Sequence, residues 1–341
     1  MKKTFVLVAI MLGLSVATSA QVKKASAPER QRWRADLYGD LYGDVESVTI
    51  RNYKLEDRFG EFDKVVDGPT RLYTFNLRGD VAEVAEYNSD GSLEWKFIRK
   101  YDSVGNVVEA ANYNSDGSLD RKYIYKYDSA GNVVECAEYN SDGSLDKKHT
   151  LKYDSAGNRV EQASYNSDGL LEHTYKYDSA GNRVEWVMYE SDGSMKFKDT
   201  CAYKYDSLGN MVEKARYYSD GSLDCKVIYK YDSAGNRVED ASYYPSGSLD
   251  WKYTYKYDSA GNKVEHDEYF SCGSMEWKYI YKYDSAGNNV EYAFYKSDGS
   301  MKWKYTYKYD SAGNMVTKTY YEYKFGTMTP VKQLEREIVY R

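Results

Sequence analysis

The stretch YKYDSAGNRVEDASYYPSGSLDWKYTYKYDSAGN, residues 229–262, contains one complete unit of a sequence that recurs along most of this chain. Each unit holds a Tyr-Asp-Ser-Ala-Gly-Asn turn, a short strand-like run, a second turn of the type Asn-Ser-Asp-Gly-Ser, and a longer strand-like run. Tyr-Asp pairs begin at Tyr101, Tyr127, Tyr153, Tyr177, Tyr205, Tyr231, Tyr257, Tyr283 and Tyr309, and Phe75-Asn76 stands one period earlier. A fixed period of this size indicates a repeat architecture, in which each unit packs on its neighbours.

Both turn sequences predict the same local geometry. An Asx residue at the first position, serine at the second and glycine at the fourth are typical of a type I turn followed by a left-handed glycine, as in Asp128–Asn132 and Asn114–Ser118. Pro245 replaces the serine in one unit, and the fixed φ of proline suits that position. Each repeat therefore predicts two tight turns and two antiparallel strands.

The longer strand shows the alternation of a β-strand. Trp251, Tyr253 and Tyr255 point one way, whereas Lys252 and Thr254 point the other way. The spacing between units is 26 residues except at Tyr153, where 24 is followed by 28. A change of two residues keeps every side chain on its face of the sheet. This indicates that the fold depends on which face each side chain occupies.

The shorter strand leaves two interpretations open. A valine such as Val264 and the tyrosine five residues later, Tyr269, stand an odd number of positions apart. Either both faces of the sheet pack against something, or a bulge lets the valine, the usual alanine and the tyrosine face one way. Intervening residues such as Gln162, Trp186, Lys214, Asp240 and His266 vary between units and are expected to be exposed.

The chain divides into four predicted segments. Residues 1–20 have the charged start, apolar centre and small-residue end of a signal peptide. Residues 21–70 form an N-terminal cap segment, with a strand from Val45 to Tyr53 and a long loop over 54–70. Ten tandem repeats of 26 residues fill 71–324, with Met315–Lys324 as the last strand. Residues 325–341 form a C-terminal cap, in which Glu335–Tyr340 is expected to make the closing edge.

These observations predict an all-β fold. Tandem antiparallel β-hairpins are expected to form one long sheet that twists or spirals into a partial shell. An outer-membrane barrel is an alternative, because alternating strands and a signal peptide fit it. Lysines recur opposite the aromatic face, however, and both sets of turns are equally short, which disfavours a lipid-facing wall.

The string Tyr-x-Tyr-Asp-x-x-Gly-Asn, followed by Asp-Gly and another Tyr-Asp, resembles the YD repeats of Rhs and teneurin proteins. Residues 125–132, Asp142-Gly143 and Tyr153-Asp154 show it, and the match extends over about residues 73–321. The resemblance implies strand-turn-strand units that spiral into a shell. This chain differs from that family in its slightly longer period and in lacking the Asp-Pro-x-Gly-Leu ending and a toxin domain.

The composition sets limits on partners and chemistry. Loss of Lys2 and Lys3 with the signal peptide takes the formal charge from −6 to −8, which argues against nucleic acid as a partner. The histidines are His149, His173 and His266, and no nucleophile, zinc or phosphate-loop motif accompanies them. The oxygen-rich turns could hold calcium, but Asx and glycine explain them without a metal. We expect no enzyme activity, no metal and no cofactor.

The four cysteines do not form a matched set. Cys136, Cys201 and Cys225 fall at different positions of strand-like runs, and Cys272 replaces the aspartate of a turn. A disulfide framework in a repeat protein would recur at matching positions, so we expect four free thiols.

The aromatic residues are the main indication of function. Trp251, Trp277 and Trp303 hold the same position in three successive repeats, and each leads alternating tyrosines that begin with Tyr253, Tyr279 and Tyr305. Such a grid could stack sugar rings or contact a protein, or it could be the core of the sheet. We expect an exported protein, periplasmic or extracellular, in which these six residues bind a glycan or a cell-surface protein. A structural or shell-like element without a ligand is the alternative.

Overall fold

The computed structural model describes residues 32–35, 39–324 and 326–341, and the predicted signal peptide lies outside these ranges. The longer repeat strands each end at the tyrosine of a Tyr-Asp pair. They are β7 (Leu93–Tyr101), β9 (Leu119–Tyr127), β11 (Leu145–Tyr153), β13 (Leu171–Tyr177), β15 (Met195–Tyr205), β17 (Leu223–Tyr231), β19 (Leu249–Tyr257), β21 (Met275–Tyr283) and β23 (Met301–Tyr309).

The shorter repeat strands alternate with the longer ones along the chain. They are β6 (Val81–Tyr87), β8 (Val107–Asn114), β10 (Val133–Asn140), β12 (Arg159–Tyr165), β14 (Arg183–Tyr189), β16 (Met211–Tyr217), β18 (Arg237–Tyr243), β20 (Lys263–Tyr269), β22 (Asn289–Lys296) and β24 (Met315–Lys324). The remaining strands are β1 (Arg32–Ala35), β2 (Gly39–Tyr42), β3 (Val45–Arg58), β4 (Glu61–Val66), β5 (Thr70–Phe75) and β25 (Thr327–Tyr340).

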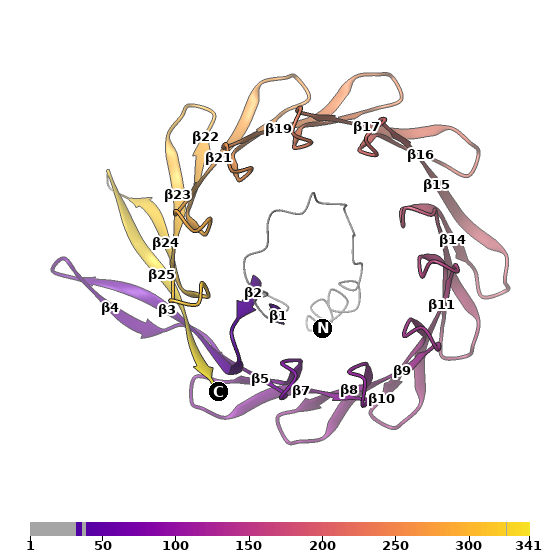
Figure 1. The fold of residues 1–341 in the computed structure, drawn as a ribbon, viewed down its shortest axis with the longest axis horizontal. Helices are drawn as coiled ribbons and strands as arrows, with labels where there is room; N and C mark the ends of the chain where they lie inside the picture. Colours follow the sequence, from indigo (N-terminus) through magenta and orange to yellow (C-terminus); the bar gives the residue numbers. More distant parts are fainter. Residues whose placement is uncertain (1–31, 36–38, 325) are drawn as a thin grey trace.

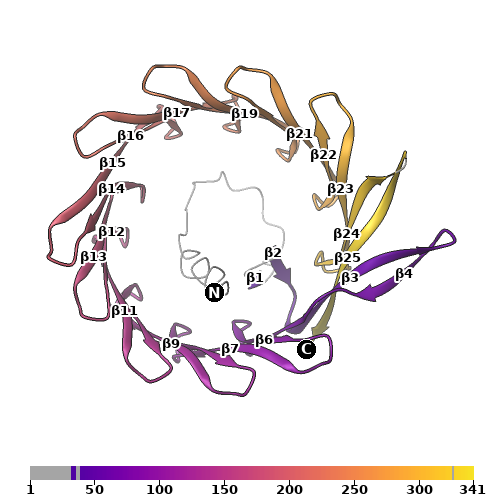
Figure 2. The ribbon, with the colours of Figure 1, turned by 180° about the vertical axis from the view of Figure 1, so that it is seen from behind.

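The hairpins close into a barrel (Figures 1 and 2). The described wall has 22 strands, β3 and β5 to β25, each antiparallel to its neighbours. Closure comes from β25, which pairs with β24 on one side and with β3 on the other. The prediction of an open, partial shell is therefore wrong. The sheet is closed, because the strands on either side of the repeats pair with each other and leave no free edge.

The segment predicted as a long loop also differs. The strand β3 continues to Arg58, and β4 pairs with its outer half, while β5 pairs with its inner half from Ser47 to Ile50. The expected strand at Val45–Tyr53 is thus confirmed, but most of residues 54–70 are strand rather than loop. The hairpin of β3 and β4 projects away from the wall (Figure 1).

The turns have the predicted form. In the turn after β9, the Gly131 N–H donates to the carbonyl oxygen of Asp128 at 3.1 Å, and Gly131 has a φ of 85°. The Asp128 carboxylate accepts the N–H groups of Ala130 and Asn132, both at 2.9 Å. The Asn132 side-chain amide also donates to this carboxylate at 3.0 Å. The hydrogen bonds of the turn, that from the Asn132 side chain first, lower the pKa of Asp128.

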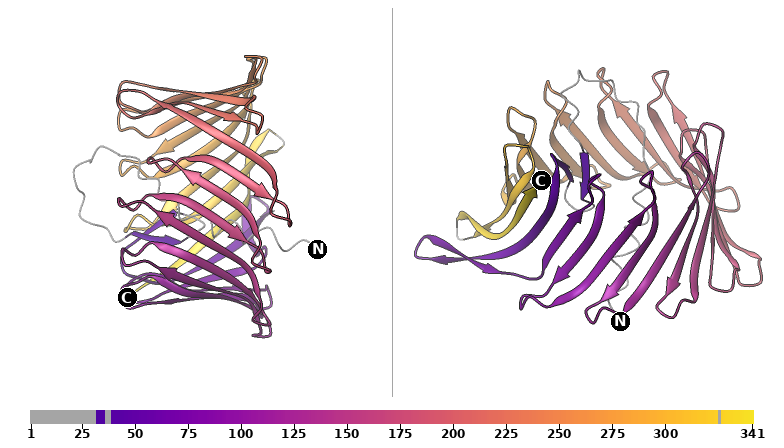
Figure 3. Two further views of the ribbon diagram at one scale, coloured as in Figure 1. Left: turned by 90° about the vertical axis from the view of Figure 1, so that its right-hand side faces the viewer. Right: turned by 60° about the horizontal axis from the view of Figure 1, so that its bottom comes forward.

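The two ends of the barrel differ in width. In Figure 1 one set of turns curls towards the axis, and the hairpins at the other end flare outward, among them β24–β25. The flaring end is therefore that of the Asn-Ser-Asp-Gly-Ser turns, and the Tyr-Asp turns lie at the narrow end. Figure 3 shows the strands inclined to the barrel axis. At about 4.8 Å between strands and a tilt of about 40°, such a wall encloses a space about 40 Å across.

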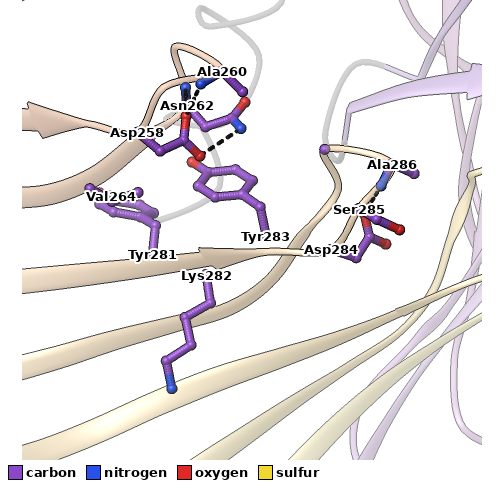
Figure 4. Close-up of a pocket in the computed structure, with 11 residues that line it drawn as sticks. Asp258, Ala260, Asn262, Val264, Tyr281, Lys282, Tyr283, Asp284, Ser285 and Ala286 are labelled. Atoms are coloured by element: carbon purple, nitrogen blue, oxygen red, sulfur yellow. Dashed lines mark hydrogen bonds between the residues drawn. The ribbon is translucent and has the colours of Figure 1, made fainter.

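Each Tyr-Asp hairpin contains a bulge. Tyr257 lies opposite Lys263 and Lys256 opposite Glu265, so Val264 is the extra residue. Val264 lines a hollow together with Tyr281, on the aromatic face (Figure 4). The ring of Tyr269 lies on the other face, 4.4 Å from Lys252 Nζ. Of the two interpretations, the one in which both faces of the sheet are packed is therefore right: a bulge is present, but it does not bring the valine and the tyrosine onto one face.

The aromatic face is the inner face of the barrel. Leu41 of β2, which projects inside the ring in Figures 1 and 2, packs in a buried cluster with Val48 and Leu334 of the wall. Leu334 lies opposite Lys318 in the sheet register. The Lys318 amine lies 4.2 Å from the ring centre of Tyr305, so the tyrosines share the face that Leu41 covers.

The outer face carries rows of ion pairs. In eight repeats a lysine before the Tyr-Asp pair contacts the glutamate of the next strand, as Lys256 contacts Glu265 at 2.7 Å. The other pairs are Lys100–Glu109, Lys126–Glu135, Lys152–Glu161, Lys176–Glu185, Lys204–Glu213, Lys230–Glu239 and Lys282–Glu291. Each lysine is exposed, so single pairs add little stability, and the rows chiefly keep this face compatible with water.

Candidate ligand-binding wall

The predicted aromatic residues lie within one continuous patch on the inner wall between β19 and β24, here termed the aromatic plate. All six predicted site residues belong to it. Its members are Trp251, Tyr253, Tyr255, His266, Trp277, Tyr279, Tyr281, Tyr292, Phe294, Trp303, Tyr305, Tyr307 and Tyr320.

The rings of the plate contact one another both within a strand and across successive strands. Trp251 stacks on Tyr253 with ring centres 4.5 Å apart. Phe294 fills the space between two of the tryptophans, since its ring centre is 5.0 Å from that of Trp277 and 4.9 Å from that of Trp303. Aromatic pairs at such distances add stability beyond the area that they bury.

Sequence reasoning missed the residues that join the tryptophan rows. His266, Tyr292 and Phe294 come from the short strands, whose variable positions were predicted to be exposed. In the register of the sheet, Tyr255 lies opposite His266 and Trp303 opposite Phe294. Counting from the adjacent turn would place Phe294 opposite Lys302, on the outer face, because the register shifts between Phe294 and Tyr295.

The predicted exposure of the variable positions is wrong as a whole. Gln162, Trp186, Lys214 and His266 are half-buried, and Asp240 is only 2% exposed. The Asp240 carboxylate is paired with Arg237 and accepts the Tyr255 hydroxyl at 2.6 Å. These positions face the inner wall, where neighbouring side chains cover them.

The plate is neither a dry core nor a freely exposed ladder. Its three predicted tryptophans and three leading tyrosines are all half-buried. A fully buried apolar cluster lies elsewhere, around Leu41, Val45 and Val48. The plate therefore combines rings that neighbours hold in place with ring surface that remains accessible.

Cations lie over several of these rings. Lys263 Nζ is 5.0 Å from the ring centre of Tyr281 and 5.4 Å from that of Tyr255, and Lys318 lies over Tyr305. Burial lowers the pKa of both lysines, and contacts with the ring faces favour their charged form. Burial also raises the pKa of Tyr279 and of Tyr292 to about 12, so their hydroxyl groups stay neutral.

A second group of rings lies on β13 to β15. Tyr175 stacks on Trp186 with ring centres 6.3 Å apart and planes at 6°, and Phe197 meets the edge of Trp186 at 5.3 Å. His173 lies 6.0 Å from Trp186. Aromatic surface on the inner wall is thus not confined to the plate.

Hollows open between successive turns at the narrow end. One, of about 480 Å³, lies between the Asp258–Asn262 turn and the tyrosines Tyr281 and Tyr283 (Figure 4). Lys282 points to the other side of the strand in the same view. The Tyr283 hydroxyl donates to the carbonyl oxygen of Lys263 at 2.9 Å, which ties one repeat to the next.

The three histidines lie on the inner wall against neighbouring side chains. His149 Nδ1 is 2.8 Å from the Ser164 hydroxyl oxygen, a distance that a nucleophile and its base would share. Ser164, however, is 5% exposed and lies within β12, which pairs on both sides. Because β12 is paired with β11 and β13, the backbone around Ser164 is engaged in the sheet and does not form the pair of free N–H groups that stabilises an oxyanion. Burial lowers the pKa of His266 to about 4, so that ring is neutral.

All four cysteines are free; Cys136 and Cys201 are buried, and Cys272 is exposed. Within the described ranges, no group of three or more His, Cys, Asp or Glu side chains could hold a metal ion. In that same part of the chain, no helix is long and apolar enough to cross a bilayer.

The sequence matches no family model and no curated protein. Among solved structures, the Tc holotoxin pore of Photorhabdus luminescens matches with a TM-score of 0.30 and 12% identity over 84% of this chain. A complex of TcdB2 and TccC3 without its hypervariable C-terminal region matches with a TM-score of 0.26 and 12% identity over 88% of this chain. The chain covers 19% and 21% of those two, about a fifth of their length.

A porin-like protein from Bacteroides uniformis is also similar, with a TM-score of 0.30 and 9% identity. That match covers 86% of this chain and 98% of the other. No family model confirms the YD-repeat resemblance, and tandem β-hairpins are what the structure itself shows.

Proposed function

We propose that this chain is an exported, non-enzymatic protein whose inner wall binds a glycan. The aromatic plate carries the proposal, because it joins half-buried tryptophan and tyrosine rings into one surface on the concave side of the barrel. Large rigid rings with polar tips provide much contact area at little entropic cost. Their arrangement across alternate strands suits successive rings of an extended sugar chain.

The charged side chains of the outer wall favour a barrel whose outer face contacts water rather than lipid. Its repeated Lys–Glu pairs occupy positions where a lipid-facing wall would carry apolar side chains. Charged side chains at such positions destabilise a barrel in a bilayer. We therefore propose that ligands meet the inner wall in an aqueous compartment, periplasmic or extracellular.

The test uses the mature protein, a panel of soluble polysaccharides, and isothermal titration calorimetry with tryptophan fluorescence. The triple variant Trp251→Ala, Trp277→Ala, Trp303→Ala is expected to lose at least tenfold in affinity, since each aromatic contact contributes about 0.5–1.5 kcal/mol. Trp95→Ala is the matched control, because Trp95 holds the same repeat position outside the plate.

The outcomes separate binding from a purely structural role. A folded triple variant that binds as tightly as the wild type would refute the glycan-binding proposal. If no polysaccharide binds and no protein partner is recovered on the mature chain, the shell-like alternative is favoured. In that case the only effect of the triple substitution should be a loss of stability, because the tryptophan rings of the wild type pack against neighbouring rings.

A further inference from the structure

The one break in the repeat spacing changes the inner wall. The strand β13 has 7 residues and β15 has 11, whereas the other long strands have 9. In regular units the tyrosine of the Tyr-Asp pair donates to a carbonyl oxygen of the preceding unit, as Tyr231 does to Met211 at 2.8 Å. In the long unit Tyr203 takes this role, and its hydroxyl donates to the carbonyl oxygen of Arg183 at 2.7 Å. Tyr205 is left 41% exposed beyond it.

The break also releases a tyrosine hydroxyl. Tyr177 ends the short strand, and its hydroxyl makes no hydrogen bond within the described chain. Its ring is held instead by Arg159, whose guanidinium lies 4.1 Å from the ring centre. Tyr177 therefore keeps a polar group available at the point where the spacing is irregular.

A hollow of about 600 Å³ opens at this break, here termed the basic hollow. It is lined by the tyrosines Tyr177, Tyr203, Tyr229 and Tyr231 and by the cations Arg183, Lys214 and Arg237. Lys214 lies opposite Tyr203 in the register, on the inner face. The basic hollow adjoins the aromatic plate, because Arg237 shares the Asp240 carboxylate with Tyr255.

The charges of the basic hollow do not balance. Arg237 is paired with buried Asp240, and Arg183 lies 3.9 Å from buried Asp199. Lys214 has no ion-pair partner in the described part of the chain. Three cations thus face two carboxylates, and the excess charge lies on a half-buried amine. Turn aspartates such as Asp178 stand at the rim, but their carboxylates accept the N–H groups of their own turns.

We propose that the basic hollow binds one acidic group, a carboxylate or a sulfate ester, of a polysaccharide that also lies on the aromatic plate. This inference rests on the proposed glycan binding and narrows the ligand to an acidic chain. Lys214 donates to the acidic oxygens together with the accessible N–H groups of Arg183 and Arg237. The Tyr177 hydroxyl donates to the same group, and the tyrosine rings around it exclude water.

Calorimetry with paired polymers tests this site. Polygalacturonate is compared with its methyl ester, which has the same backbone without charge, and dextran sulfate with dextran. The wild type is expected to prefer one acidic polymer about tenfold, and the preference should fall as ionic strength rises. The pair that shows the preference identifies the acidic group as carboxylate or sulfate.

Lys214→Met should abolish the preference and its salt dependence while leaving affinity for the neutral polymer unchanged, and Lys214→Arg should restore it. The control is Lys226→Met. Lys226 is a half-buried lysine opposite Ala215, on the outer face next to Lys214. Melting curves establish that each variant is folded.

Two results would overturn the proposal that the basic hollow binds an acidic group. One is equal affinity of the wild type for the acidic and neutral polymers, and the other is an unchanged preference in folded Lys214→Met. If a neutral polymer still binds in either case and depends on the plate tryptophans, the glycan-binding proposal survives alone. Absence of binding by every polymer refutes both proposals.

Discussion

Asn314 holds Tyr42 by both ends of its side-chain amide. Its Oδ1 accepts the Tyr42 N–H at 2.6 Å, and its Nδ2 donates to the Tyr42 carbonyl oxygen at 2.8 Å. Asn314 belongs to the last Tyr-Asp turn and is fully buried, whereas Tyr42 ends β2. In a regular turn the same asparagine bonds within its own turn, as Asn288 Nδ2 donates to Asp284 at 2.9 Å. In the last turn the asparagine side chain therefore bonds to β2 instead of to the aspartate of its own turn, and this attaches β2 to the barrel wall.

Asn314→Ala should destabilise the barrel by about 2–4 kcal/mol, because it removes three part-buried hydrogen bonds, two to the Tyr42 backbone and one to the Tyr340 hydroxyl. Asn288→Ala removes the same side chain from an exposed turn and should lower stability by less than about 1 kcal/mol. Urea denaturation of the two variants gives the comparison. Equal losses would show that Asn314 does no more than stabilise its own turn.

This joint marks where sequence reasoning succeeds and where it stops. The repeats predict their own turns, as in Asp128–Asn132, because Asx and glycine act locally. Closure depends on β25 pairing with β3, and neither segment repeats. Nothing in the 26-residue period specifies how many hairpins complete a circle. That number follows from accumulated twist and tilt, which the sequence does not display.

The candidate site divides in the same way. The position shared by Trp251, Trp277 and Trp303 is legible from the period alone. The contribution of Phe294 cannot be predicted from the period, because a bulge shifts the register between β22 and β23 and places Phe294 opposite Trp303. The spacing break at Tyr153 was visible in the sequence, and its even parity explains why the wall continues through it. The hollow at this break could not be predicted, because its prediction requires the hydrogen-bond partner of each tyrosine hydroxyl, which only the structure gives.

Asp267 takes the place of an alanine on the outer face, and this should make it a weak point. It is 5% exposed and 3.4 Å from Lys278, which is also paired with Glu265 at 3.0 Å. Burial, reinforced by Glu265, raises the pKa of Asp267. Asp267→Ala should therefore stabilise the protein at about pH 7, by about 1 kcal/mol.

The sign of the pH dependence follows from that raised pKa. The ionised carboxylate is penalised in the folded state, so the penalty is present above the folded pKa and vanishes as the pH falls below the unfolded value of about 3.9. The advantage of Asp267→Ala should shrink accordingly in acid, as measured by urea denaturation across pH. The reverse change, Ala293→Asp at the same repeat position, should destabilise at neutral pH, since Ala293 is fully buried. A pH-independent gain for Asp267→Ala would contradict the ionisation argument.

The tyrosine of each Tyr-Asp pair should matter through its hydroxyl only where that hydroxyl bonds to the preceding repeat. Tyr283→Phe removes the donor to the Lys263 carbonyl oxygen and should lower the free energy of unfolding by about 1 kcal/mol. Tyr177→Phe, at the same repeat position, should leave stability nearly unchanged. Comparable losses in the two variants would show that Tyr177 has an inter-repeat bond after all.

The four thiols should react in an order set by burial. Hydrogen bonds, first that from the Ser274 hydroxyl, lower the pKa of exposed Cys272, whereas burial raises the pKa of Cys136 to about 11. Because the thiolate is the reactive form, iodoacetamide at about pH 8 should label Cys272 rapidly and Cys136 only after unfolding in urea. Mass spectrometry of time points gives the order, and Cys272→Ser should remove the rapid phase without changing the melting temperature. Rapid labelling of Cys136 in the folded protein would mean that the inner wall around β10 opens to solvent, and a bridged pair would exclude four free thiols.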